Sequence, residues 1–146
     1  MANTVKIKKY SDVVVEYPAG GTITPGHLVR LNSSGQVVVH SSSAGKVVPI
    51  MFALEDELQG KDITDNYSSG DRVQVWIPGR GDVVNAILTT SQAVAVGDFL
   101  VSNGNGTLKE LTGDTATVYE DATVVGVAIE AVTTTSSTAR VKVMII

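Results

Sequence analysis

Short apolar runs alternate with polar turn residues along the whole chain. Within residues 72–77, Val73 and Val75 share one face of an extended segment, and Arg72 and Trp76 lie on the other. Alternation with a period of two is the pattern of a strand whose two faces differ in burial. The same pattern predicts strands within residues 4–8, 12–17, 28–31, 36–40, 47–54, 83–88, 99–102, 107–111, 124–132 and 139–146.

Turn residues separate these strands. Residues 32–35 and residues 103–106 are rich in Asn and Gly, which tolerate the positive φ of tight turns, so each segment predicts a β-hairpin. Residues 55–61 predict one helical turn ended by Gly60. The chain is therefore predicted to be all-β, folded as a compact β-barrel or sandwich of short antiparallel strands.

Two segments of the chain resemble each other. Residues 25–37 align without a gap with residues 96–108, and each is followed by a further apolar run. We interpret this as an internally duplicated β-unit, with repeats at about residues 23–54 and 94–130. The alternative is that two glycine-turn hairpins resemble each other by chance in a valine-rich chain.

Composition supports the β prediction and limits the chemistry. Apolar residues make up 43% of the chain but aromatic residues only 5%, and the β-branched residues Val, Ile and Thr favour pleated sheet. The 146 residues suit one ordinary domain, which we divide into an N-terminal arm with the first strands (1–16) and a single β-domain (17–146). The chain has no Cys, which excludes disulfides and thiol chemistry.

Charge and hydropathy exclude two classes of partner. Charged residues make up 18% of the chain, the net charge is −4, and no basic stripe is present, so we expect no nucleic-acid partner. The apolar runs are too short for a helix that crosses a bilayer, and residues 1–10 lack the apolar core of a signal peptide. We expect no membrane partner, and synthesis in the cytoplasm without export.

The chain contains no recognisable catalytic motif. It has neither a G-x-S-x-G elbow nor a phosphate-binding loop, and the G-x-G triplets at 79–81 and 104–106 lack a third glycine. We interpret His27 and His40 as strand-end residues rather than a metal pair, and the aspartates of the loop around residues 62–71 as solvated rather than cation-binding. We therefore predict that the protein is not an enzyme and has no cofactor or metal.

Several residues are candidates for contact with other proteins. Trp76 is either an exposed anchor beside Arg72 or a core residue of a strand covered on both faces, and both interpretations stay open. Residues 1–9 form an arm that is able to add a strand to a partner's sheet edge. The Arg-Gly-Asp tripeptide at 80–82 is interpreted as a tight turn rather than an adhesion motif. The interface candidates are Val5, Ile7, Tyr10, Arg72, Trp76 and Arg80.

Three segments together resemble the small capsid decoration (cement) proteins of tailed double-stranded DNA bacteriophages. They are residues 17–29 (YPAGGTITPGHLV), 52–61 (FALEDELQGK) and 70–82 (GDRVQVWIPGRGD). The resemblance covers roughly residues 17–111, and it is a pattern of turns and strands without a catalytic signature.

The resemblance implies a structural virion protein. Such a protein binds the outer surface of the phage capsid, commonly as a homotrimer, and stabilises the shell by clamping adjacent major capsid proteins. The implied partners are the major capsid protein and further copies of the chain, and the implied location is the outer capsid surface of the virion. The alternative is a carbohydrate- or host-surface-binding β module, such as a head fibre base, which would require aromatic platforms that this chain supplies sparsely.

Overall fold

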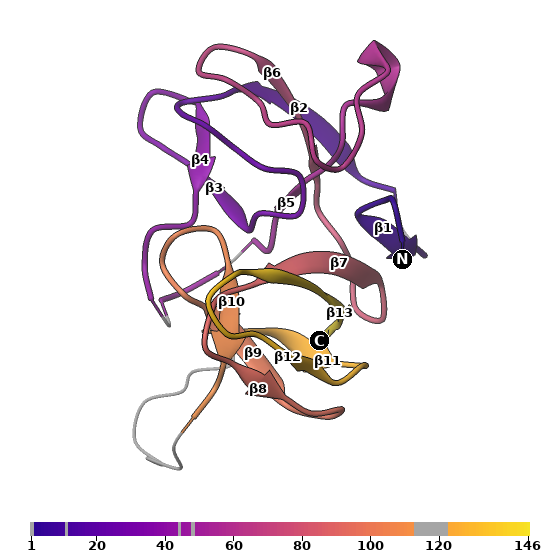
Figure 1. Cartoon of the computed structure of the whole chain (residues 1–146). Helices are drawn as coiled ribbons and strands as arrows, with labels where there is room; N and C mark the ends of the chain where they lie inside the picture. Colours follow the sequence, from indigo (N-terminus) through magenta and orange to yellow (C-terminus); the bar gives the residue numbers. More distant parts are fainter. Residues whose placement is uncertain (1, 11, 44, 48, 113–122) are drawn as a thin grey trace.

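The computed structural model describes residues 2–10, 12–43, 45–47, 49–112 and 123–146 (Figure 1). Residues 113–122 of the second expected repeat, and Val48 of the strand predicted at 47–54, lie outside the described residues. The strands are β1 (Lys6–Lys8), β2 (Val14–Pro18), β3 (Val29–Leu31), β4 (Val37–Val39), β5 (Phe52–Ala53), β6 (Arg72–Trp76), β7 (Val83–Leu88), β8 (Ala93–Val94), β9 (Phe99–Ser102), β10 (Leu108–Glu110), β11 (Val124–Ala128), β12 (Val132–Thr133) and β13 (Ala139–Ile145).

The all-β prediction is confirmed. Strand β7 has the predicted bounds, and both predicted hairpins form, as the antiparallel pairs β3–β4 and β9–β10. The predicted helical turn is a 3-10 helix, η1 (Glu57–Gln59), which ends at Gly60 with φ +70. Strand β8 was not predicted, because two residues are too few to establish a period. Within the described part of the chain, no helix has the length and apolarity of a membrane span.

The first half of the chain forms one β-unit, which we call unit 1 (residues 12–78). Strand β6 lies between β2 and β5, and a bridge from Phe52 to Leu28 joins β5 to the β3–β4 hairpin. The strand order is therefore β2-β6-β5-β3-β4. A parallel bridge between Ala19 and Val37 brings the end of β2 back to β4, so the unit closes on itself.

The second half, unit 2 (residues 82–146), repeats this topology. Its strand order is β7-β13-β11-β9-β10, and a parallel pair between Leu108 and Leu88 closes the barrel. The parallel pair departs from the expected purely antiparallel arrangement. A closed ring with an odd number of strands cannot alternate in direction throughout, so a five-stranded barrel requires at least one parallel pair. The closure therefore explains the departure.

Equivalent hydrogen bonds relate the two units residue by residue. The amide of Gly26 donates to Ala53 O and the amide of Gly97 donates to Ala128 O, both at 2.8 Å. The Ile23–Tyr67 bridge of unit 1 has its counterpart in the short β8–β12 pair of unit 2. The repeated topology extends from β2 to β6 and from β7 to β13, so it is longer than the segments recognised in the sequence.

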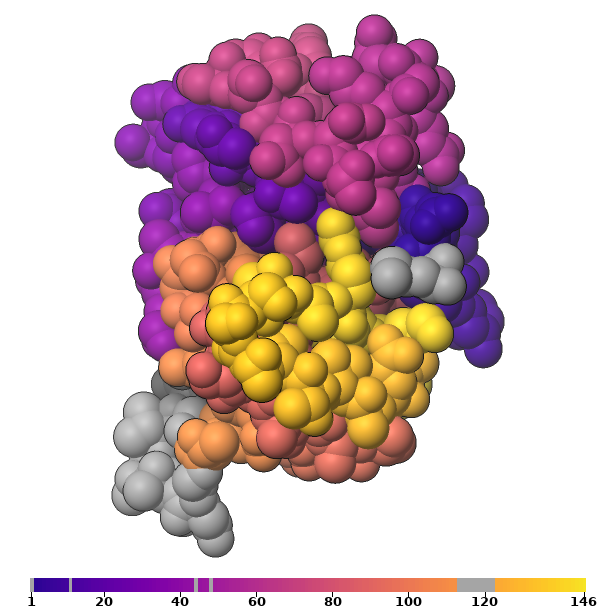
Figure 2. Space-filling view, in the orientation of Figure 1, coloured from indigo at the N-terminus to yellow at the C-terminus, as the bar shows by residue number. Residues whose placement is uncertain are grey.

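Two apolar clusters fill the molecule. One lies inside unit 1 and includes Val73 and Val75. The larger one fills unit 2 and continues across the boundary to the outer face of unit 1, where it includes Leu28, Phe52 and Trp76. The two units lie one above the other in Figures 1 and 2.

Candidate interaction surface

The N-terminal residues lie on their own chain. Strand β1 pairs antiparallel with β7, and the side chain of Val5 is fully buried. The buried Glu55 carboxylate accepts hydrogen bonds from the amide of Val5, at 3.0 Å, and from the hydroxyl of Thr4. The segment that we expected to add a strand to a partner instead adds one to unit 2, so Val5 is unavailable to a partner in this conformation.

Trp76 is a core residue, which decides between the two interpretations left open by the sequence. Its exposed fraction is 0%, and it belongs to the apolar cluster of the junction. Val73 and Val75 on the inner face of β6 are buried inside unit 1, and on the outer face Trp76 is buried at the junction with unit 2. The Nζ atom of Lys6 lies 5.7 Å from the centroid of the indole ring.

The other candidates remain accessible but do not form one site. Tyr10 is 73% exposed and lies against the turn that contains Arg80, since a Cβ added at Gly81 would be 3.6 Å from its ring. Arg72 is exposed at the start of β6, and Ile7 is half-buried in β1. Tyr10 and Arg80 are therefore neighbours, and Arg72 belongs to a different strand.

The Arg-Gly-Asp tripeptide forms a tight turn, as the sequence analysis predicted. Asp82 is fully buried, and its carboxylate accepts hydrogen bonds from the amide of Gly79, at 2.8 Å, and from the amide of Tyr10. An adhesion motif must present its carboxylate to a receptor, whereas this carboxylate holds the turn and the arm in place.

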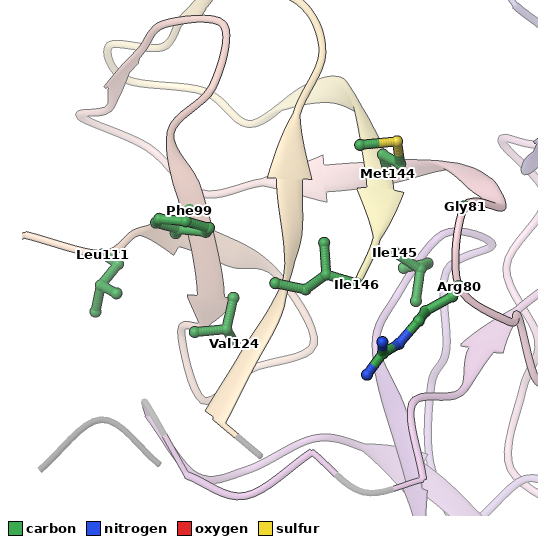
Figure 3. A pocket seen from close by; sticks show the side chains of 8 residues that line it. All are labelled: Arg80, Gly81, Phe99, Leu111, Val124, Met144, Ile145 and Ile146. Carbon is green, nitrogen blue, oxygen red and sulfur yellow. The ribbon is translucent and has the colours of Figure 1, made fainter. Parts of the chain in front are cut away.

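Sequence reasoning missed a large hollow of the described surface. It is a groove of about 950 Å³ at one end of unit 2 (Figure 3). Phe99 is 50% exposed there, and Met144 and Ile146 are also exposed. The groove is lined by Arg80, Gly81, Phe99, Leu111, Val124, Met144, Ile145 and Ile146.

The groove lining is suited to contact with an apolar protein surface. Its side chains are apolar apart from the Arg80 guanidinium, and apolar centres with a cationic edge are typical of protein–protein contacts. The strand pattern did not reveal it because Phe99, Leu100 and Val101 are consecutive apolar residues, and their sequence does not tell which face is covered.

The histidines and loop aspartates have internal hydrogen-bond partners. The two ring nitrogens of His40 lie 2.9 Å from Ser102 Oγ and 2.9 Å from Lys46 O. In the loop after η1, the carboxylates of Asp62 and Asp71 accept hydrogen bonds from nearby backbone amides. Among the described residues, no group of three His, Cys, Asp or Glu side chains is placed to hold a metal ion.

His27 makes stability depend on pH. Burial, and secondarily the Arg140 guanidinium, lower the pKa of His27 to about 4. Its Nδ1 accepts a hydrogen bond from the amide of Thr24 at 3.1 Å, which requires the unprotonated nitrogen. In the unfolded chain the pKa returns to about 6.5, so the unfolded state binds the proton more readily.

Stability is therefore expected to fall as the pH is lowered from about 6.5 to about 4, by up to about 2–3 kcal/mol from this residue. Urea unfolding of wild type and a His27→Asn variant, across this range, isolates the contribution. Asn retains an acceptor but does not titrate there. The difference in unfolding free energy between the two proteins should shrink on acidification, and a constant difference would contradict the assignment.

Comparisons with known proteins reveal a shared fold. No family model matches the chain, and a search of the curated proteins finds no match. Among solved structures, the head fiber gp8.5 N base of bacteriophage phi29 is similar, with a TM-score of 0.58 over 93% of this chain and 95% of that chain. The two sequences are 14% identical, so the likeness establishes a common fold.

Proposed function

We propose that this chain is a structural protein of a phage virion that binds the outer surface of the capsid. The observation that carries the proposal is the similarity of fold, over nearly the whole of both chains, to the N base of a phage head fibre. The decoration-protein resemblance of residues 17–111 points independently to the same class of particle. In this proposal the chain is made in the host cytoplasm and acts without catalysis, cofactor or metal.

The physical properties of the fold support a binding role. Two barrels that share a continuous apolar junction make a rigid body, which suits a protein that must hold neighbouring subunits at fixed spacing. The groove of unit 2 supplies an apolar centre. Arg80 and Gly81 contribute a turn to its lining, and the exposed ring of Tyr10 lies beside Gly81. The partners in the proposal are the major capsid protein and further copies of the chain, with a homotrimer as the expected assembly.

Two roles on the capsid fit these observations. In the first, the protein is a cement that clamps adjacent major capsid proteins, as the sequence resemblance implies. In the second, it is the base of a head fibre, which the fold similarity favours. A carbohydrate-binding role is less well supported, because the described surface exposes few aromatic rings, chiefly Tyr10 and Phe99.

Binding to expanded, undecorated heads of the cognate phage tests the proposal. We expect saturable co-sedimentation with these heads and none with heads of an unrelated phage. A cement should also raise the temperature at which the heads release DNA, whereas a fibre base should bind without this effect. Absence of saturable binding to cognate heads would refute the capsid-binding function.

A further inference from the structure

The junction between the units contains a glycine turn inserted into a slot. Gly106, in the turn at residues 103–106 of unit 2, lies between Leu28 and His40 of unit 1. Its carbonyl accepts a hydrogen bond from Leu28 N at 2.8 Å, and its amide donates to His40 O at 3.1 Å. A Cβ added at Gly106 would be 3.0 Å from His27 and 3.1 Å from Val39. A side chain at this position would therefore crowd the slot, where glycine fits without this crowding.

Unit 2 has the equivalent slot, and no turn of the described residues occupies it. Phe99 and Leu111 occupy the positions of Leu28 and His40 in the repeat, because Leu111 N donates to Phe99 O at 2.9 Å just as His40 N donates to Leu28 O at 2.9 Å. Both residues line the groove in Figure 3. Phe99 is 50% exposed, whereas Leu28, which the junction covers, is 1% exposed.

The outer face of unit 2 around this slot is also more exposed than the equivalent face of unit 1. Met144 of β13 holds the position that Trp76 holds in β6. Trp76 pairs with Phe52 of β5, and Met144 pairs with Val127 of β11, the equivalent strand of unit 2. Met144 is 37% exposed and Trp76 is 0% exposed. Unit 1 buries this apolar face against unit 2, whereas the equivalent apolar face of unit 2 is exposed.

Unit 1 has a turn equivalent to the one that unit 2 inserts into the junction, and this turn projects away from its own chain. The turn at residues 32–35 matches the turn at 103–106, since Asn32 N donates to Gln36 O at 2.9 Å and Asn103 N donates to Thr107 O at 2.9 Å. Gly35 takes the place of Gly106, with φ +73 and +84 respectively. A Cβ added at Gly35 would meet no atom within 4 Å, so this turn does not occupy a slot of its own chain.

The side chains beside the inserted turn and beside the slot are polar at the junction, and their equivalents on the exposed surfaces are both apolar. In the junction, Ser102 Oγ lies 2.9 Å from His40 Nδ1. The equivalent of Ser102 is Leu31, which is 38% exposed, and the equivalent of His40 is Leu111. A polar pair inside the junction therefore corresponds to an apolar pair on the free surfaces, and burying two leucines against each other is favourable.

We propose that the turn at residues 32–35 of one copy inserts into the groove between Phe99 and Leu111 of the next copy, with Leu31 packed on Leu111. The contact repeats the junction between units, and it joins the chains head to tail. Such a contact closes into a ring when the rotation between copies allows it. The proposal deepens the self-association in the proposed function and does not depend on capsid binding.

Disulfide trapping tests the contact directly, since the chain contains no Cys. A disulfide requires two Cβ atoms about 3.5–4.5 Å apart. A variant with Leu31→Cys and Leu111→Cys is expected to form covalent oligomers on oxidation that dissociate on reduction. A variant with Leu58→Cys and Leu111→Cys is the control, because Leu58 is exposed on η1 and outside the proposed contact. Cross-linking no greater than in the control would overturn the proposal.

Measurement of the mass in solution tests the contact independently, with charged residues introduced at Leu31 and Leu111. Wild type is expected to have at least twice the mass of one chain, which is 15.3 kDa. Either Leu31→Glu or Leu111→Lys should reduce the mass to that of one chain. The two substitutions together should restore the assembly, because Glu and Lys then face each other. Melting temperature and circular dichroism establish that each variant is folded.

A wild type that stays at the mass of one chain would overturn the proposal. So would an assembly that survives both single substitutions in folded protein. These outcomes are separate from those of the head-binding experiment. A single chain that binds heads leaves the proposed capsid binding standing and refutes the self-association. An assembly that does not bind heads refutes the capsid binding and leaves this contact standing.

Discussion

Replacement of Trp76 with alanine is expected to lower the free energy of unfolding by about 3–5 kcal/mol, as for other large buried aromatic residues. The indole ring is fully buried at the junction, so its removal leaves a cavity in the larger apolar cluster. Because this cluster continues into unit 2, both units should lose stability together. Urea unfolding monitored by circular dichroism measures the loss.

Two variants control this experiment. Trp76→Phe retains most of the apolar volume and should cost clearly less than Trp76→Ala. Leu58→Ala removes an apolar side chain that is 81% exposed, and should change the unfolding free energy by less than about 0.5 kcal/mol. If Trp76→Ala were as stable as Leu58→Ala, the assignment of Trp76 to the core would be wrong.

Alanine substitution at two equivalent glycines should have unequal effects. Gly106 and Gly35 both have positive φ, so a side chain at either position is expected to cost about 1–2 kcal/mol. At Gly106 the new Cβ also meets His27 and Val39, and this overpacking should add about 1–3 kcal/mol. At Gly35 no such contact exists within one chain.

Unfolding of Gly106→Ala and Gly35→Ala measures the difference, and both are best made in the Leu31→Glu background, which removes the proposed contact between copies. The difference between the two variants isolates the steric demand of the slot, because the backbone strain is common to both. Equal losses of stability would show that the junction does not require glycine at position 106.

Local pattern was sufficient for the elements themselves. The alternation of Val73 and Val75 with polar residues located β6, the consecutive β-branched and apolar residues at 83–88 located β7, and the Asn/Gly turns located both hairpins. These signals are short-range, since the pleat and the turn geometry depend on a few neighbouring residues. Strands β8 and β12 are exceptions, because each is defined by its pairing with the other far along the chain. The sequence did not predict β8, and it predicted one strand at 124–132 where the structure has β11 and a separate β12.

The interface candidates show where local pattern ends. Val5 and Trp76 have strand positions that the sequence indicated, but their burial depends on the junction, which brings residues from both units together. Tyr10, Arg72 and Arg80 are exposed, and the groove beside Arg80 was not predicted at all. Its lining combines residues of β9, β11 and β13 with the turn at residues 80–81 and the residues just after β10 and β13, which are brought together only in the folded chain.

The sequence by itself determined the all-β class, the two hairpin turns, the absence of thiol chemistry and the likeness between two segments of the chain. Tertiary structure decided the rest. The parallel closures of the barrels, the docking of β1 on β7 and the burial of one apolar face but not its equivalent all depend on contacts distant in sequence. The physical reason is that a strand pattern specifies that a face is apolar, whereas what covers that face is set by the packing of whole units.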